Sequence, residues 1–247
     1  MTEFTLSLAG YPIHVEALFE STKRYCSAYL CDGPALVSVC VAASDIDAER
    51  EKAAREDEIE GLQPRTFSDA YLETLALYRK IADALLMRDV LLFHGSVMAC
   101  GGKAYLFTAP SGTGKTTHCR LWLSEIEGSY VLNGDKPLLR VESDRVLACG
   151  TPWQGKEKLG RNEILPLSAV CILSRDTKNH IEAVSFHDAM PALFSQSNRP
   201  RRPEAIRKTL ELIDRLGRHT RLYSLGCNTE PEAAHVSFRG MTGGCGL

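Results

Sequence analysis

The segment Ala109–Thr116 reads Ala-Pro-Ser-Gly-Thr-Gly-Lys-Thr and has the residue types and spacing of a phosphate-binding loop. It ends in Gly-Lys-Thr after four intervening residues, with alanine where the first glycine of this pattern usually stands. Gly112 and Gly114 allow the backbone to turn its N–H groups inward around an anion. Lys115 can then reach the β- and γ-phosphates, and the Thr116 hydroxyl can bind Mg²⁺. The spacing therefore predicts a site for ATP or GTP with Mg²⁺.

The predicted nucleotide-binding residues are those of the loop and the residue that follows it. They are Ala109, Pro110, Ser111, Gly112, Thr113, Gly114, Lys115, Thr116 and Thr117. An apolar strand is expected before this loop and a helix after it. The N-terminus of that helix would present its positive dipole end to the phosphates.

A carboxylate is expected at the end of the next strand. Asp135 follows an apolar segment in the turn Asn133-Gly134-Asp135, where a phosphate-binding loop needs an acid for Mg²⁺ or for accepting a proton. Aspartate is also common in such turns for structural reasons alone. Because the phosphate-binding loop is present, the pattern favours a functional role for Asp135.

His94 is the third candidate. It ends a short predicted strand just before the hairpin that leads into the loop, which could place its imidazole near the phosphates. A histidine at a strand end can equally be structural, and the residues alone leave both readings open.

The elements that must position these residues are predicted to form a sheet with flanking helices. The expected strands are 90–93, 96–100, 103–108, 129–132, 137–141, 145–148, 169–173, 181–184 and 221–225, and the expected helices are 116–126, 203–216 and 231–241. Gly101-Gly102 predicts an antiparallel hairpin directly before the phosphate-binding loop. That hairpin favours a mixed sheet over a purely parallel one.

The first 88 residues have a different pattern of predicted elements, with short strands followed by charged and amphipathic helical segments. Strands are expected at 2–8, 25–30 and 35–41, with a turn at 32–34 between the last two. Capping boxes at 44–47 and 66–69 open a charged segment, 48–60, and a helix to about residue 87. The charged segment is expected to be a solvated helix or loop. Apolar residues at helical spacing predict the core-facing side of the second helix: Tyr71, Leu75, Tyr78, Ile81 and Leu85.

Composition excludes several classes of protein. The chain has 247 residues and a formal net charge of -2, which argues against a nucleic-acid partner because phosphate backbones select basic surfaces. No apolar run is long enough to span a bilayer, and the acidic start of the chain does not resemble a signal peptide. Nine cysteines without metal-binding spacing are expected to be reduced thiols, which predicts a cytoplasmic protein without membrane contacts.

The run from His94 to Thr116 supports a specific family resemblance. It reads His-Gly-Ser-Val-Met-Ala-Cys-Gly-Gly-Lys-Ala-Tyr-Leu-Phe-Thr-Ala-Pro-Ser-Gly-Thr-Gly-Lys-Thr and precedes the strand that ends in Asp135. This order resembles the catalytic core of HPr kinase/phosphorylase, within the phosphoenolpyruvate-carboxykinase-like P-loop proteins. The resemblance covers about 91–141 and extends less clearly to 173, whereas residues 1–88 do not resemble the N-terminal domain of that enzyme.

The resemblance implies a role for each matching residue. His94 would be the active-site histidine, Lys115 the P-loop lysine, Thr116 the Mg²⁺-binding hydroxyl and Asp135 the acceptor of the substrate's hydroxyl proton. The family usually has paired acids where this chain has Asp135-Lys136. The resemblance therefore does not extend to the phosphorylase direction or to the details of metal binding.

The family also carries a metal-binding glutamate further along the chain. Glu157 occupies a comparable place, with an exposed acid in a polar loop as the alternative. Nearby, Lys156 could bind phosphate, and Trp153 could stack on a ligand or pack in the core. A basic cluster could supply a transition-state arginine or form a solvated loop; its members are Arg199, Arg201 and Arg202.

Together these patterns predict an α/β fold, a mixed-sheet P-loop kinase core of the phosphoenolpyruvate-carboxykinase-like kind with a small N-terminal α+β region. The expected divisions are 1–88, 89–242 and a disordered tail, 243–247. The catalytic residues would be His94, Lys115 and Asp135, and the metal ligands Thr116, Asp135 and Glu157.

The predicted function is transfer of a γ-phosphoryl group from ATP or GTP, with Mg²⁺, to a hydroxyl acceptor. A protein or peptide serine and a small metabolite both stay open as acceptors, as does self-association of the chain. The alternative function is a nucleotide-binding switch or accessory protein without kinase activity.

Overall fold

The computed structural model describes residues 1–59, 61, 63–198 and 202–243. The chain divides into two compact units, Met1–Leu85 and Leu86–Leu247, and each is described by itself. The three predicted divisions of the chain stay predictions. Of the predicted tail, Gly243 is described and adopts the left-handed conformation that ends a helix, and the other four residues lie outside the described part.

The first unit contains a three-stranded sheet in the order β1 (Thr2–Leu8), β2 (Tyr11–Ala17) and β3 (Val37–Cys40). β1 and β2 are antiparallel, and β3 runs parallel to β2. The turn Ala9-Gly10 joins the first two strands with positive φ at both residues, the conformation that matches strand twist in a two-residue hairpin. β2 was not predicted, although its buried residues alternate along the strand as strand residues should.

The strand predicted at 25–30 is wrong. The structure places there the end of α1 (Glu20–Tyr25) and a 3₁₀ turn, η1 (Ser27–Tyr29). The buried side chains are Cys26 and Tyr29, whereas Tyr25 and Leu30 are exposed. A spacing of three between buried positions is a helical spacing, and a strand would bury alternate residues.

Two helices complete this unit, α2 (Ala43–Ile59) and α3 (Asp69–Leu86). The predicted capping residues of both boxes are wrong by about two positions, since α2 begins before Ser44 and α3 begins at Asp69. The Asp45 carboxylate accepts a hydrogen bond from the Ala42 N–H at 2.8 Å, and the Ser68 hydroxyl accepts one from the Tyr71 N–H at 3.3 Å. The predicted core side of α3 is correct for Tyr78, Ile81 and Leu85, which are buried, and Leu75 is partly buried. It is wrong for Tyr71, which is 46% exposed because Leu72 takes the buried position.

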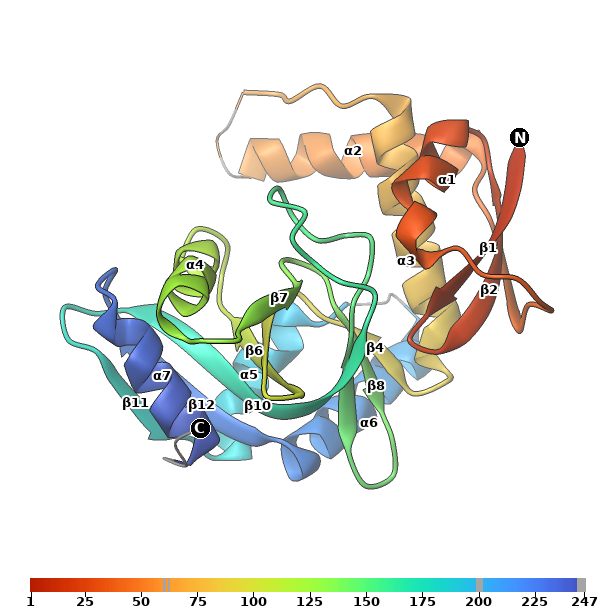
Figure 1. The fold of residues 1–247 in the computed structure, drawn as a ribbon. Helices are drawn as coiled ribbons and strands as arrows, with labels where there is room; N and C mark the ends of the chain where they lie inside the picture. The colour runs from red at the N-terminus through yellow and green to blue at the C-terminus, as the bar shows by residue number, and fades with distance from the viewer. Residues whose placement is uncertain (60, 62, 199–201, 244–247) are drawn as a thin grey trace. The chain divides into compact units, whose positions relative to one another are not determined.

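The second unit is built on a nine-stranded mixed sheet, which confirms the predicted α/β class (Figure 1). Its strands are β4 (Val90–Leu92), β5 (Ser96–Cys100), β6 (Lys103–Thr108), β7 (Tyr130–Asn133), β8 (Leu138–Val141), β9 (Val146–Cys149), β10 (Ile164–Arg175), β11 (His180–Ala183) and β12 (Arg221–Cys227). The order is β4-β8-β9-β10-β6-β5-β7, with β12 beside β10 and β11 beside β12.

The long strand β10 joins two parts of this sheet. Its first residues pair antiparallel with β9, and the rest pairs parallel with β6 on one side and β12 on the other. The predicted hairpin β5–β6 through Gly101-Gly102 is confirmed, and the strands predicted at 137–141 and 145–148 pair antiparallel as β8 and β9. β10 is longer than the predicted 169–173 because its first residues pair with β9.

Helices cover both faces of the sheet. α4 (Lys115–Glu125) and α7 (Glu232–Thr242) pack on one face, and α5 (Phe186–Gln196) and α6 (Pro203–His219) pack on the other. Alternate residues of β6 join the two cores, with Phe107 against the first pair and Leu106 against the second. α5, which contains Pro191, was not predicted. Among the described residues, no helix is long and apolar enough to cross a membrane.

Candidate phosphotransfer site

The predicted phosphate-binding loop connects β6 to α4. Gly112 has φ +77° and Gly114 has φ +126°, a backbone region that residues with a Cβ rarely adopt. Gly114 is the N-cap of α4, so the unpaired N–H groups of the helix's first turn open toward the loop. Short-range geometry therefore requires glycine at both positions and leaves donors that suit an anion.

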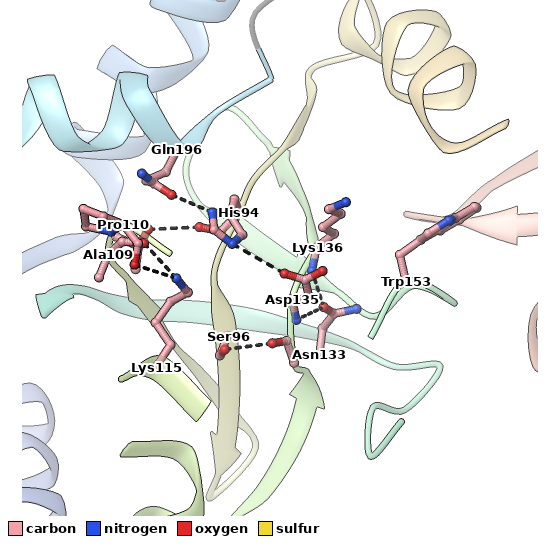
Figure 2. Close-up of polar contacts among 12 residues, drawn as sticks. His94, Ser96, Ala109, Pro110, Lys115, Asn133, Asp135, Lys136, Trp153 and Gln196 are labelled. Atoms are coloured by element: carbon pink, nitrogen blue, oxygen red, sulfur yellow. Dashed lines mark hydrogen bonds and ion pairs between the residues drawn. The ribbon is translucent and has the colours of Figure 1, made fainter. Parts of the chain in front are cut away.

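Lys115 folds back over this loop. Its Nζ donates to the carbonyl oxygens of Ala109 at 2.8 Å and Pro110 at 3.3 Å (Figure 2). Burial lowers the pKa of the Lys115 ammonium, and the negative charge of Asp135 opposes that shift. The ammonium is thus held at the loop by bonds that a stronger acceptor, such as a phosphate oxygen, could replace.

The turn that carries Asp135 is built by a buried asparagine. The side-chain oxygen of Asn133 accepts from the N–H groups of Asp135 at 3.0 Å and Lys136 at 2.8 Å. Its amide donates to the Thr151 hydroxyl at 2.9 Å, and that hydroxyl donates to the Lys136 carbonyl at 2.8 Å. Asn133 and Thr151 are both fully buried. Because Asn133 makes the turn, the Asp135 carboxylate is not used to hold it.

The turn at Asp135 is also held by neighbouring segments, by the backbone of Gln154 on one side and by Gly95 and Ser96 on the other. A Cβ on Gly134 would lie 2.4 Å from the carbonyl oxygen of Gln154, so only glycine fits there. The Ser96 hydroxyl donates to the Gly134 carbonyl at 2.9 Å, and the Gly95 N–H donates to the Asp135 carbonyl at 2.9 Å. The end of β7 is therefore tied to the residues that follow His94.

His94 lies between Asp135 and α5 (Figure 2). Its Nδ1 is 2.7 Å from the side-chain oxygen of Gln196, and its Nε2 is 3.5 Å from Oδ1 of Asp135. Burial and the charge of Lys115 lower the pKa of the His94 imidazole, while Gln196 and Asp135 oppose this shift. His94, Lys115 and Asp135 all line one cavity of about 530 Å³.

Glu157, the predicted metal ligand of the following loop, lines this cavity together with Thr116 and Lys156. Its carboxylate accepts from Nε of Arg120 at 2.7 Å, an α4 residue that the sequence did not single out. Within the described part of the chain, no group of three or more histidine, cysteine or acidic side chains could hold a metal ion. The metal roles of Thr116, Asp135 and Glu157 stay predictions.

The remaining candidates lie elsewhere. Trp153 is buried, does not line the cavity and lies beyond Lys136 from His94 (Figure 2). Core packing is therefore the role that its burial supports. Arg199 and Arg201 lie outside the described residues, and Arg202 is the N-cap of α6.

Arg175 is a site residue that sequence reasoning missed. It ends β10 and donates to the carbonyl oxygens of Gly112 at 2.6 Å and Thr113 at 3.2 Å. It also lines a second cavity, of about 370 Å³, which shares Gly112, Gly114 and Thr117 with the first. No sequence motif marks it, because its contact with the loop depends on the parallel pairing of β10 with β6.

Comparison with known proteins yields little beyond the fold class. No protein-family pattern matches the sequence, and no curated protein matches it. Solved structures do match, among them an HPr(Ser) kinase/phosphatase from Coxiella burnetii, with 8% identity and a TM-score of 0.37. That match covers 62% of this chain and 97% of the other. The relationship is distant and at the level of the fold alone.

Proposed function

We propose that this chain is a phosphotransferase that moves the γ-phosphoryl group of ATP or GTP to a hydroxyl acceptor. The observation that carries the proposal is the convergence of Lys115, His94 and Asp135 on one cavity beside the glycine loop. A cation, a neutral imidazole and a carboxylate within one cavity are the groups that phosphoryl transfer to a hydroxyl uses.

The loop would bind the phosphates. Its backbone N–H groups and the Lys115 ammonium would neutralise charge that builds on the phosphoryl oxygens. Lys115 would exchange its two carbonyl partners for phosphate oxygens. The Thr116 hydroxyl and the Asp135 carboxylate, both on the cavity, are oxygen ligands of the kind that Mg²⁺ prefers. When bound, Mg²⁺ would stabilise negative charge on the phosphates.

Asp135 would orient and deprotonate the acceptor. In the transfer step the acceptor oxygen forms a bond to the γ-phosphorus, and the bond from that phosphorus to the bridging oxygen breaks. The nucleoside diphosphate leaves, and the hydroxyl proton passes to the Asp135 carboxylate, which lies 3.5 Å from Nε2 of His94. The acceptor would be a serine of a protein or peptide, or a small metabolite.

A nucleotide-binding switch is the second candidate, and one contact favours it. Arg120 engages Glu157, and Lys136 stands where a second acid could have served the metal. Such a protein would bind Mg-ATP tightly and turn it over negligibly, with no stimulation by any acceptor.

Nucleotide turnover separates the two candidates. ADP release from Mg-ATP is measured alone and with cell extract divided into small-molecule and macromolecular fractions. Stimulation by one fraction supports the kinase and shows which class of acceptor it uses. Tight ATP binding with negligible turnover in every fraction would support the switch and contradict the kinase.

Asp135→Asn tests the proposed mechanism directly. We expect transfer to fall by about 100-fold or more, since an aligned base contributes about 10²–10⁴ in rate, while ATP affinity changes little. Asp144→Asn is the matched control, because Asp144 is an exposed acid in the β8–β9 turn of the same unit. Equal losses of binding and transfer in Asp135→Asn would contradict the assignment of Asp135 as the base.

A further inference from the structure

The C-terminal end of α5 runs along the residues that end β4. The His94 N–H donates to the Gln196 carbonyl at 2.7 Å, and the Asn198 N–H donates to the Leu92 carbonyl at 3.0 Å. Phe93 and Ser197 form an antiparallel bridge between these two contacts. Gln196 is therefore held against His94 by the backbone, independently of the contact between their side chains.

The side-chain contact belongs to a chain of hydrogen bonds whose direction can be assigned. The Ser195 hydroxyl donates its single proton to the Ala192 carbonyl at 2.9 Å. The Ser195 oxygen is then an acceptor for the Gln196 amide nitrogen at 3.3 Å. This orientation leaves the Gln196 amide oxygen facing Nδ1 of His94 at 2.7 Å.

The opposite orientation of the Gln196 amide would lose the bond to Ser195. Its oxygen would face the Ser195 oxygen, whose proton is already donated to a backbone carbonyl. A backbone carbonyl can only accept, so the direction of the whole chain is set by Ala192. Nδ1 of His94 must then carry a proton and donate it to Gln196.

We infer that Gln196 is a positioning residue that holds neutral His94 in the tautomer with the proton on Nδ1. Nε2 then presents a lone pair toward Asp135, 3.5 Å away. Two acceptors then face the same part of the cavity, and an acceptor hydroxyl can donate its single proton to either of them. The inference rests on the proposed function for that last step and on the hydrogen bonds alone for the tautomer.

The charged groups around His94 agree with a neutral ring that accepts at Nε2. Lys115 and Lys136 oppose a positive charge on the imidazole, and Asp135 is the negative group that faces it. In this tautomer Nε2 cannot donate a hydrogen bond to a phosphate oxygen. His94 would therefore accept a hydrogen bond from the acceptor hydroxyl, and Lys115 and the loop would bind the phosphates.

Nitrogen-15 NMR of the histidine side chains measures the tautomer without any activity. At pH 8 the spectra show which ring nitrogen of neutral His94 carries the proton, and His94→Asn assigns its signals. We expect the Nδ1–H form in the wild-type chain and a shift toward the Nε2–H form in Gln196→Met, where the acceptor is lost. Ser195→Ala, which releases the Gln196 amide, is expected to give a mixture of the two forms.

Gln154→Met is the matched control. Gln154 lines the same cavity, but its side-chain oxygen accepts a hydrogen bond from the Gly160 N–H and does not contact His94. We expect its His94 signals to match the wild type. A wild-type Nε2–H tautomer, or an unchanged tautomer in Gln196→Met, would overturn the inference.

Kinetics with Mg-ATP then separate this inference from the proposed function. In Gln196→Met, kcat for transfer is expected to fall by about 100-fold with an unchanged KM for ATP. A tautomer shift in a chain that transfers no phosphoryl group would leave the positioning role standing and remove the proposed function. An unchanged kcat despite the tautomer shift would overturn the catalytic part of the inference.

Discussion

The glycine loop and the Asp135 turn face the same cavity but are held in opposite ways. The loop is largely exposed, and its lysine is bonded to the loop's own carbonyls. The Asp135 turn rests on Asn133 and Thr151, which are fully buried and hydrogen-bonded. If the loop binds phosphate and Asp135 faces the acceptor, as proposed, we expect the loop to rearrange when a ligand binds and the Asp135 turn to stay in place.

The largest effect is expected from Asn133→Ala. The substitution leaves the N–H groups of Asp135 and Lys136, in a half-buried turn, without their acceptor. At about 1–3 kcal/mol for each of these two groups, the free energy of unfolding should fall by about 2–6 kcal/mol. Urea unfolding measures it.

Thr113→Ala, in the glycine loop, is the variant whose loss of stability is compared with that of Asn133→Ala. The Thr113 hydroxyl donates to the Pro110 carbonyl at 2.9 Å in an exposed turn, so we expect a loss below about 1 kcal/mol. Equal losses in the two variants would show that the Asp135 turn is no more firmly built than the loop.

The second prediction concerns His118, which lies on α4 just behind the loop. It is buried against Phe107, and its Nε2 contacts the Ser237 hydroxyl at 3.0 Å. Burial lowers the pKa of His118 to about 4, from an ordinary value of 6.5. Between these values the unfolded chain binds a proton that the folded chain does not. Stability is therefore full above pH 6.5 and falls as the pH drops toward 4, by about 3 kcal/mol.

Unfolding measured across this pH range tests the assignment. His118→Leu should flatten the pH dependence below 6.5, whereas His187→Gln, at a histidine that is 97% exposed, should leave it unchanged. An unaltered slope in His118→Leu would show that the acid loss comes from other groups.

The third prediction separates binding from stability on the loop side. Lys115→Met removes the ammonium that we propose binds phosphate, and we expect affinity for Mg-ATP to fall by about 10- to 100-fold. The free energy of unfolding should fall by only about 1 kcal/mol, because Pro110 is exposed and only the carbonyl of buried Ala109 loses a donor away from solvent. Calorimetric titration with a non-hydrolysable ATP analogue measures the affinity, with Lys103→Met as an exposed-lysine control. Unchanged affinity would contradict the phosphate role of Lys115.

The sequence predicted the parts of the site that lie in short, continuous patterns. β5 and β6 have the predicted bounds, because a two-glycine turn and apolar strands specify them locally. The loop glycines, His94 and Asp135 could be found for the same reason. β2 and α5 were missed, although Ser185 caps α5 by accepting from the Asp188 N–H at 3.2 Å, a signal that is present in the sequence.

Residues that reach the site from distant elements could not be predicted. Gln196 contacts His94 from the end of α5, and Arg175 contacts the loop from the end of β10. Their positions depend on strand order and on the pairing of β4 with the segment after α5, which no local pattern specifies. The resemblance pointed to Glu157, and Glu157 lines the cavity. Its pairing with Arg120 depends on the position of α4, which no local pattern specifies.

The smallest effect is expected from Arg175→Ala. Its affinity for the ATP analogue shows whether the loop must change conformation to bind. The guanidinium holds the carbonyls of Gly112 and Thr113 from an exposed position, so its loss should cost well under about 1 kcal/mol of stability. If Arg175 holds the loop in its binding conformation, affinity for the ATP analogue should fall about threefold, with Arg145→Ala unchanged. If the bonds to Arg175 must instead break on binding, the affinity will rise. A rise would show that the loop, unlike the Asp135 turn, is held in a conformation that its ligand has to undo.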